Sequence, residues 1–457
     1  MLIRKLEKAG KNFAVAAMAA VIAATGLTAC GKEPEQSADV SPTPEATLTP
    51  AATPTPEPTP TEAATPTPEP TPTEIPPEWI VENMNIGPAV ALPSLKDVYS
   101  DYFKIGVGLT GYAADVVMVR SEAMSEVVKH HFNSTTLTNL MKPSYLLNQA
   151  GSIENSKNGD GMPAVKFDPC IEALDFCKEN GIPMRGHTLV WHAQVPDWFF
   201  REGYEDDADF VDRDTMLARM ESYIKQVLTF TSENYPGVIY CWDVVNEAVE
   251  PAVGSHETET GYFIRTKNGE EENLWYKVVG ADYVEKAFEY ARKYAPSDVK
   301  LFYNDYNTFQ PVKNEKICLL LKDLAEKGLV DGVGMQSYIG RDDPDIKGRT
   351  GSVQRAIENF AELGLEIQIT ELTINVAIEK PDERTLLAQA MRYQEMLELL
   401  TEMDTAGGGK ANITSVTFFG LMDEYMLYPD NKEYSRLFDG ELQPKEALFR
   451  ILDVVKK

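Results

Sequence analysis

The chain has 457 residues and a formal net charge of −28, from 71 acidic and 43 basic side chains. A surface this acidic repels the phosphates of nucleic acids and of anionic lipids, so we expect neither as a partner, and a neutral polymer suits it better. The five cysteines and five histidines show no metal-ligand spacing, so we expect no metal and no cofactor.

The first 30 residues have the layout of a secretory signal, with basic residues before an apolar, alanine-rich run that ends in small residues. The run closes as Leu27-Thr28-Ala29-Cys30-Gly31, which resembles the lipobox of bacterial lipoproteins. That resemblance implies a lipid on Cys30 and a mature protein held on the extracellular face of the bacterial cell membrane by this anchor alone. The alternative is an ordinary signal peptide in which the cysteine has no role.

Residues 31–77 form a second segment that cannot build a hydrophobic core. They hold about half of the chain's 29 prolines, and Thr-Pro-Thr-Pro-Glu-Pro-Thr-Pro-Thr-Glu occurs twice, at 53–62 and 65–74. Proline-rich chain favours extended polyproline II at about 3.1 Å per residue. We therefore expect a disordered spacer that reaches on the order of 100 Å from the membrane.

Residues 78–457 have the composition of one globular domain, in which β-rich runs alternate with amphipathic helical patterns. The expected strands are 103–109, 131–136, 184–190, 238–245, 300–304, 332–336, 366–370 and 415–420. The expected helices are 171–180, 216–234, 283–294, 314–327, 353–363 and 385–403. Eight strands alternating with helices favour a (β/α)8 TIM barrel over an open doubly wound sheet, with the second unit, near 137–168, the least regular.

In such a barrel, functional side chains gather where strands end and loops begin. Glu247 follows the strand-like run 242–246, and Glu371 follows Ile369-Thr370. Two carboxylates are the minimum equipment for cleaving a glycosidic bond, because one protonates the leaving oxygen while the other attacks or stabilises the sugar. Further polar residues follow other expected strands, namely His187, Trp191, Asn304 to Asn307, Gln336 to Tyr338, and Asp423.

Several of these residues also have ordinary structural interpretations. His187 is compatible with a buried core histidine, and Trp191 and Trp198 with core aromatic residues; we favour the core for Trp198. His192 and Asp305 suit buried hydrogen-bonding positions. Cys170 and Cys177 lie seven residues apart on an expected helix, about 10 Å, which is too far for a disulfide.

Taken in order along the chain, many short segments resemble the family 10 glycoside hydrolases, the large family of endo-β-1,4-xylanases. The similarity covers nearly all of residues 92–450. The segments that carry it are 132–134, 139–142, 186–194, 241–247, 303–307, 334–337, 369–372, 420–423, 437–439 and 443–445.

The resemblance implies a retaining endo-β-1,4-xylanase, with Glu247 as the general acid/base and Glu371 as the nucleophile. The mechanism calls for carboxyl groups about 5–5.5 Å apart, a raised pKa on the acid and an ionised nucleophile. We expect a monomer with xylan as its polysaccharide substrate. The residues that match the family's sugar-binding positions are Asn139, Lys142, His187, Trp191, Gln194, Asn246, Tyr306, Asn307, Gln336, Tyr338 and Phe419.

The chain departs from the family pattern at four positions. Thr138 replaces a usual glutamate, Tyr338 replaces a usual histidine, and Phe419 and Leu427 stand where tryptophans are expected. All four concern the glycone side of the cleft, so they leave the substrate open. The alternatives are a retaining enzyme for another β-1,4 or mixed-linkage glycan, and a glycan-binding lipoprotein without turnover.

Overall fold

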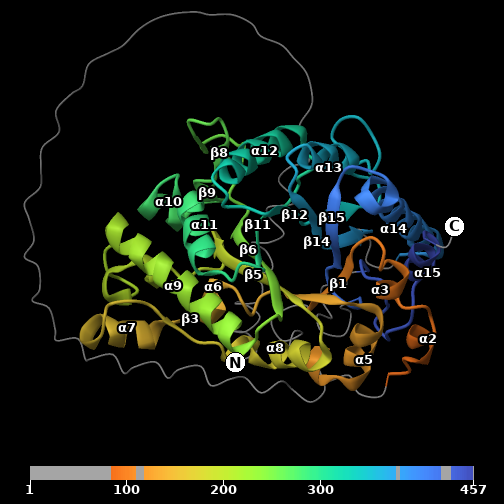
Figure 1. Cartoon of the computed structure of the whole chain (residues 1–457), viewed down its shortest axis with the longest axis horizontal. Coiled ribbons are helices and arrows are strands. Elements are labelled where there is room, and N and C mark those ends of the chain that lie inside the picture. The colour runs from red at the N-terminus through yellow and green to blue at the C-terminus, as the bar shows by residue number, and fades with distance from the viewer. Residues whose placement is uncertain (1–83, 110–117, 377–380, 424–433, 456–457) are drawn as a thin grey trace, which may run out of the picture. The chain divides into compact units, whose positions relative to one another are not determined.

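The computed structural model describes residues 84–109, 118–376, 381–423 and 434–455. The expected signal and spacer at 1–30 and 31–77, with Cys30, lie outside the described residues, and so does Leu427. Among the described residues, eight parallel strands form a closed ring with helices arranged around it (Figure 1). In ring order the strands are β1 (Lys104–Leu109), β2 (Ser134–Leu137), β5 (Met184–Trp191), β6 (Ile239–Asn246), β11 (Lys300–Asp305), β12 (Gly332–Met335), β14 (Glu366–Asn375) and β15 (Asn412–Phe418).

The ring closes because β15 pairs with β1 and β12 pairs with β14, all in parallel. The predicted (β/α)8 barrel is confirmed. Both faces of the strands are covered, which is why they read as nearly continuous apolar runs rather than alternating ones. Glycines allow close approach inside the ring: a Cβ on Gly106 would lie 2.6 Å from Thr417 Oγ1, and one on Gly334 would lie 2.2 Å from Asn304 Oδ1.

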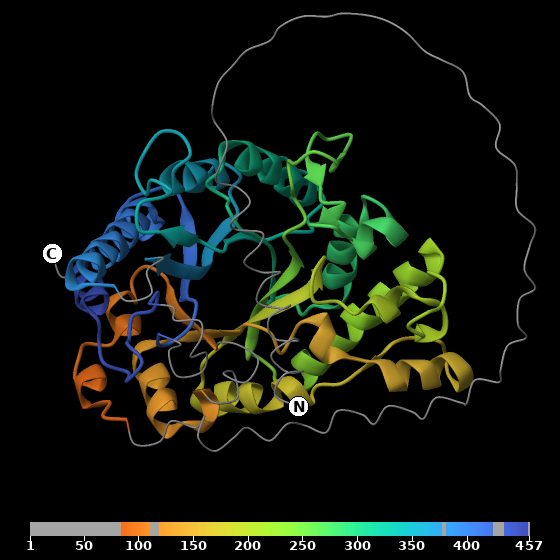
Figure 2. The same ribbon diagram turned by 180° about the vertical axis from the view of Figure 1, so that it is seen from behind.

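The outer layer consists of amphipathic helices that pack their apolar sides on the ring (Figure 2). Side chains cap several of them: Asp212 accepts from the backbone N–H of Thr215 at 2.9 Å at the start of α9, and Ser352 caps α13. The longer helices are α5 (Glu122–His131), α7 (Gln149–Asn158), α8 (Asp168–Asn180), α9 (Arg213–Asn234), α11 (Tyr283–Tyr294), α12 (Pro311–Glu326), α13 (Val353–Ala361), α14 (Glu383–Met403) and α15 (Glu446–Asp453).

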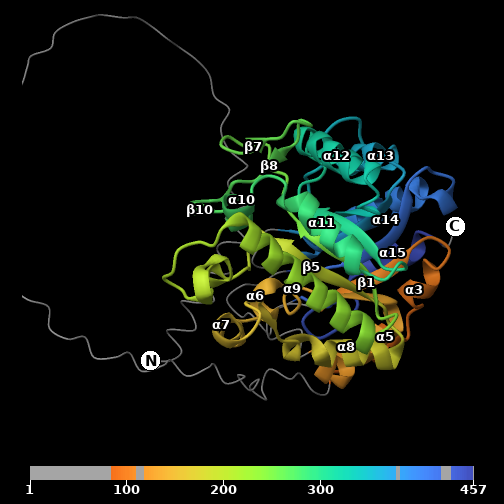
Figure 3. The same cartoon turned by 60° about the vertical axis from the view of Figure 1, so that its left-hand side comes forward.

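A long excursion between β6 and α11 carries small elements of its own. They gather in one region beside α11 and α12 (Figure 3). They are β7 (His256–Glu257), β8 (Phe263–Ile264), β9 (Lys267–Asn268), β10 (Glu271–Glu272) and α10 (Leu274–Val279). Elsewhere the short elements are α2 (Gly87–Val90), α3 (Leu95–Val98), α6 (Pro143–Leu146), β3 (Leu147–Asn148), β4 (Ala164–Val165) and β13 (Tyr338–Gly340).

Three expected strands had wrong boundaries, and the one expected at 415–420 is β15, which runs from Asn412 to Phe418. The strand expected at 131–136 begins only at Ser134, because His131 ends helix α5 and its ring is buried against the Ala89 carbonyl. The strand expected to end at Thr370 continues to Asn375, because β13 pairs with its second half. Helices α5, α7, α10 and α15 were not expected, nor were the short helices α2, α3 and α6.

The four described cysteines are free thiols, and Cys170 and Cys177 lie buried on α8 as expected. Among the described residues, no cluster of three His, Cys, Asp or Glu side chains has the geometry to hold a metal ion. Within the same ranges, no helix combines the length and the apolar character that crossing a membrane requires.

Candidate active site

The candidate residues lie at the carboxyl ends of the barrel strands. Glu247 directly follows β6, and Glu371 lies inside β14. The strand register shifts beside both: between His187 and Val190 where β5 pairs with β6, and between Ile369 and Leu372 where β14 pairs with β15. Irregular pairing of this kind re-aims side chains, and it commonly lies next to active sites.

Glu247 adopts a left-handed backbone conformation, with φ of 56°. A non-glycine residue held there costs of order 1–3 kcal/mol, which surrounding contacts must offset. Its backbone N–H donates to Asn304 O at 2.9 Å. Its carboxylate accepts from Trp191 Nε1 at 3.0 Å, from Gln336 Nε2 at 2.8 Å and from Asn246 Nδ2 at 3.1 Å. Glu247 therefore has a fixed orientation.

Glu371 is buried, with 6% of its surface exposed. Its carboxylate accepts from Asn304 Nδ2 at 3.2 Å and from Tyr338 Oη at 2.5 Å. Asn304 Nδ2 also donates to Asn246 Oδ1 at 2.9 Å. Because Asn246 donates in turn to Glu247, two amide side chains join the two carboxylates through hydrogen bonds.

Burial raises the pKa of Glu371, although a nucleophile must be ionised. The nearby His187, the hydrogen bond from Tyr338 and the charge of Lys142 lower that pKa, whereas the charge of Glu247 raises it further. The expectation of an ionised nucleophile therefore stays a prediction. This effect of Glu247 on Glu371 agrees with the hydrogen-bonded link between them through Asn246 and Asn304.

A buried network of charged side chains on β5 and β6 lies next to the site. Asp243 accepts two hydrogen bonds from the guanidinium of Arg185, at 2.9 and 2.6 Å, and one from His187 Nδ1 at 2.9 Å. Burial favours the neutral acid, but the charges and hydrogen bonds of Arg185 and His187 outweigh it and lower the pKa of Asp243. His187 is thus buried as a core histidine would be, while its orientation is fixed toward the site.

Other predicted residues surround this centre. Lys142 Nζ donates to Asn139 Oδ1 at 3.1 Å and lies 4.6 Å from the ring centroid of Trp191. The rings of Tyr338 and Phe419 meet edge to face at 5.7 Å.

Gln194 and Asn307 are less closely tied to the two glutamates. Gln194 also has a left-handed backbone, with φ of 46°, and within the described residues its buried Oε1 has no hydrogen-bond partner. The Asn307 carbonyl accepts from Gln310 N at 3.0 Å. Asn307 donates no hydrogen bond to either glutamate among the described residues.

Sequence reasoning missed Arg265 and gave no role to Asp243. Arg265 Nε donates to the Glu247 carbonyl at 3.0 Å, and its Nη2 contacts Glu250 and Tyr306. Asp243 lies inside the segment 241–247 that resembles the family, so the sequence did offer it as a candidate for a role at the site. Arg265 lies in the excursion after β6, and its only local signal is the preceding apolar pair Phe263-Ile264.

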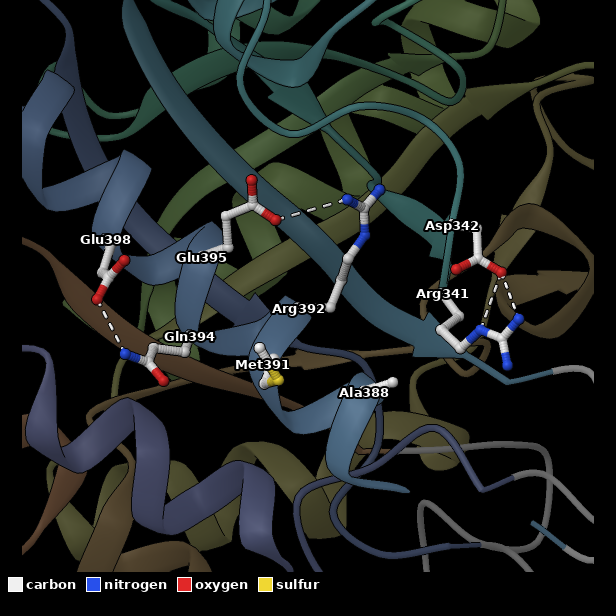
Figure 4. Close-up of a pocket in the computed structure, with 8 residues that line it drawn as sticks. All are labelled: Arg341, Asp342, Ala388, Met391, Arg392, Gln394, Glu395 and Glu398. Atoms are coloured by element: carbon white, nitrogen blue, oxygen red, sulfur yellow. Dashed lines mark hydrogen bonds and ion pairs between the residues drawn. The ribbon is translucent and has the colours of Figure 1, made fainter. Parts of the chain in front are cut away.

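A separate surface pocket of about 550 Å³ lies on the outside of the barrel, at α14 and the loop after β13, and includes neither glutamate. Figure 4 shows that its charges pair with one another: Arg341 with Asp342 at 2.5 Å, and Arg392 with Glu395 at 3.6 Å. The close-up also labels the exposed Met391. Because these charged side chains pair with one another, we assign no binding role to the pocket.

Comparison with known proteins agrees with this geometry. The chain is 48% identical over 315 residues to a Caldicellulosiruptor saccharolyticus protein named as a suspected endo-1,4-beta-xylanase, covering 68% of this chain and 96% of that protein. It is 42% identical over 363 residues to endo-1,4-beta-xylanase B of Butyrivibrio fibrisolvens, covering 79% of this chain but only 53% of that longer protein.

A solved structure of Clostridium thermocellum endo-1,4-beta-D-xylanase 10B, complexed with xylohexaose, matches with a TM-score of 0.68 and 33% identity, over 79% of this chain and 68% of that chain. The model of glycosyl hydrolase family 10 matches residues 94–454. This match spans most of the chain and includes both glutamates. The chain therefore belongs to glycosyl hydrolase family 10.

Proposed function

We propose that the chain is an endo-1,4-β-xylanase that hydrolyses internal β-1,4-xylosidic bonds of xylan with retention of configuration. The observation that carries the proposal is the pair of carboxylates, Glu247 just after β6 and Glu371 within β14, linked through Asn246 and Asn304. Family membership and relatives that carry the xylanase name support the substrate.

In this mechanism the Glu371 carboxylate attacks the anomeric carbon while the Glu247 carboxyl group gives its proton to the leaving glycosidic oxygen. The bond to the leaving sugar breaks, and a covalent glycosyl-enzyme forms on Glu371. Glu247, now ionised, removes a proton from water, which attacks the same carbon and releases the sugar from Glu371. Two inversions give net retention.

The surrounding side chains suit a neutral sugar polymer. Trp191 and Phe419 offer aromatic faces, and the amides of Asn246 and Gln336 lie beside the carboxylates, within reach of sugar hydroxyls. Among the described residues the Oε1 of Gln194 has no hydrogen-bond partner, so it is a ready acceptor for a sugar hydroxyl group. We assign Asn139, Lys142, His187, Tyr306, Asn307 and Tyr338 to the same binding surface.

The test compares the full-length protein with its Glu371→Ala variant on glucuronoxylan, carboxymethylcellulose and mixed-linkage glucan, with products resolved by chromatography. Xylo-oligosaccharides from xylan, lost in the variant, are the expected result. Glu366→Ala is the matched control, because Glu366 begins the same strand at the opposite end of the barrel. Cleavage of a glucan but not of xylan would move the assignment to another β-glycan. Binding of a polymer without cleavage would overturn the proposal that the chain is an enzyme.

We also propose that Cys30 carries a lipid that holds the protein on the outer face of the bacterial membrane, and that the protein acts there as a monomer. The support is the sequence Leu27-Thr28-Ala29-Cys30-Gly31 and the repeated proline-rich segment that follows it. Xylan is too large to enter a cell, so an extracellular position suits the activity.

A further inference from the structure

Arg265 lies where the excursion after β6 passes the backbone of Glu247. Its side chain is buried, with 6% of the residue exposed. The Nε donates to the carbonyl oxygen of Glu247 at 3.0 Å, and the Arg265 backbone N–H donates to the next carbonyl, that of Ala248, at 2.8 Å. Arg265 therefore holds two consecutive peptide groups at the residue whose backbone is strained.

The far side of the same guanidinium is also fixed. Its Nη2 donates to Glu250 Oε2 at 2.7 Å and to Tyr306 Oη at 2.8 Å, and Tyr306 Oη donates to the same Glu250 oxygen at 3.0 Å. Burial opposes the charge of Arg265, but Tyr306, Glu250 and Glu247 outweigh it and raise the pKa of Arg265. The guanidinium group of Arg265 thus stays charged and is held by hydrogen bonds from both Nε and Nη2.

The backbone of Arg265 is anchored as well. Asn273 Nδ2 donates to the Arg265 carbonyl at 2.8 Å, while Asn273 Oδ1 caps helix α10 by accepting from Trp275 N at 3.1 Å. Trp275 Nε1 then donates to the carbonyl of Trp191 at 3.0 Å, and Trp191 is the residue whose indole contacts the Glu247 carboxylate. The excursion therefore reaches Glu247 from both its backbone and its side chain.

We propose that Arg265 is a positioning residue for the acid step: it holds the left-handed backbone of Glu247 so that the carboxyl group faces the leaving oxygen. The inference rests on the proposed glycosidase function. Its consequence is specific, because losing Arg265 impairs proton donation to the leaving group and leaves the attack by Glu371 intact. Substrates whose leaving group needs no proton are therefore insensitive to the loss.

The experiment measures kcat/KM of the full-length protein and its Arg265→Met variant on two aryl β-xylobiosides. Phenol is a poor leaving group that needs the acid, and 2,4-dinitrophenol is a good one that does not. We expect Arg265→Met to lose about 10²-fold on the phenyl substrate, as for a displaced catalytic group, and at most about threefold on the dinitrophenyl substrate. Glu247→Ala should show the same selectivity more strongly.

Arg292→Met is the matched control, since Arg292 pairs with Asp331 at 2.8 Å at the opposite end of the barrel. It should leave both substrates unchanged. Equal losses on both substrates, or no loss, would overturn the inference. If Arg265→Met does not fold, Arg265→Lys carries the same comparison, because one ammonium cannot reach both Glu247 O and Glu250. A wild-type protein inactive on both substrates would instead sink the proposed function.

Discussion

Tyr338 places a phenol hydroxyl on the buried carboxylate of Glu371, at 2.5 Å. About two fifths of the Tyr338 surface, 41%, is exposed, while the edge-to-face contact with Phe419 steadies the ring. Desolvation of the hydroxyl and the charge of Glu371 raise the pKa of Tyr338 well above its ordinary value, which favours the protonated hydroxyl that donates to Glu371. A histidine, the usual family residue here, would titrate near neutral pH.

Tyr338→Phe should shift the acid limb of the pH profile of kcat/KM upward. The hydrogen bond from Tyr338 lowers the pKa of Glu371, so its loss raises that pKa, and the nucleophile then ionises only at higher pH. Hydrogen bonds to charged groups contribute about 1.5–3 kcal/mol, and the exposed ring favours the lower end, about one pH unit. The measurement is kcat/KM on xylan as a function of pH.

A matched control for this substitution is Tyr294→Phe. Tyr294 Oη donates to Glu221 Oε1 at 2.8 Å, so the variant removes another tyrosine–glutamate hydrogen bond, between the outer helices α11 and α9. Its pH profile should coincide with that of the unmodified protein. An unchanged acid limb in Tyr338→Phe would contradict the role given to the hydroxyl.

At the scale of single elements, strands buried on both faces were predictable because an uninterrupted β-branched run leaves little choice of boundary. Strand β6 illustrates this, since its expected and observed limits differ by one residue at each end. Strand β2 was misplaced because the run His131-Phe132 looks strand-like, although it ends a helix and packs on distant residues. Strand β14 continues past Glu371 through its pairing with β13, which no local pattern encodes.

The residues of the site also fall into those that local pattern predicts and those that depend on distant contacts. Glu247 and Gln336 follow strands directly and Asn246 ends β6, so local pattern and family resemblance predicted their positions. The contact between Arg265 and Glu247 could not be predicted, because 18 positions separate the two residues in the sequence. Asp243 was visible in the sequence, but its partner Arg185 lies 58 residues away. Long-range pairing of charged groups is what the sequence alone did not reveal.

Asp243→Asn should destabilise the barrel strongly. Arg185 on β5 bonds Asp243 on β6 and also donates to Gln368 Oε1 on β14 at 2.6 Å, so one guanidinium links three strands through the interior. Removing the carboxylate leaves a buried, unpaired charge, which costs about 3–5 kcal/mol. The measurement is the free energy of unfolding from urea titrations at neutral pH.

The same carboxylate sets a pH dependence. Because the pKa of Asp243 is lower in the fold than its ordinary value, its contribution to stability is present at neutral pH and is lost as pH falls through the folded pKa. The difference between Asp243→Asn and the unmodified protein should therefore shrink in acid. Asp331→Asn, which breaks a partly exposed pair with Arg292, is the control and should cost about 1 kcal/mol or less. A similar loss in both variants would contradict the role of the network.

At the scale of the whole chain, the described barrel carries the proposed binding and chemistry, and the N-terminal sequence carries the proposed location. The segment 1–77 falls outside the described residues, so its interpretation rests on composition and on the lipobox resemblance. The proposed lipid anchor and the proposed catalysis can be tested separately, because nothing in the chemistry of Glu247 and Glu371 requires a membrane.

Cys30→Ala should abolish lipid attachment without changing the kinetics of the barrel. Cells that express the full-length protein are grown with an alkyne-labelled fatty acid, and the purified protein is tested for label by click chemistry. The unmodified chain should carry label, because we propose Cys30 as the acylated residue, and Cys30→Ala should carry none. Cys170→Ala is the matched control, since its thiol is buried on α8 and beyond the reach of an acylating enzyme. Equal labelling of the Cys30→Ala variant and the unmodified chain would contradict the proposed anchor. Loss of the label, with kcat/KM on soluble aryl xylobiosides unchanged, would show that the lipid anchors the protein and has no part in catalysis.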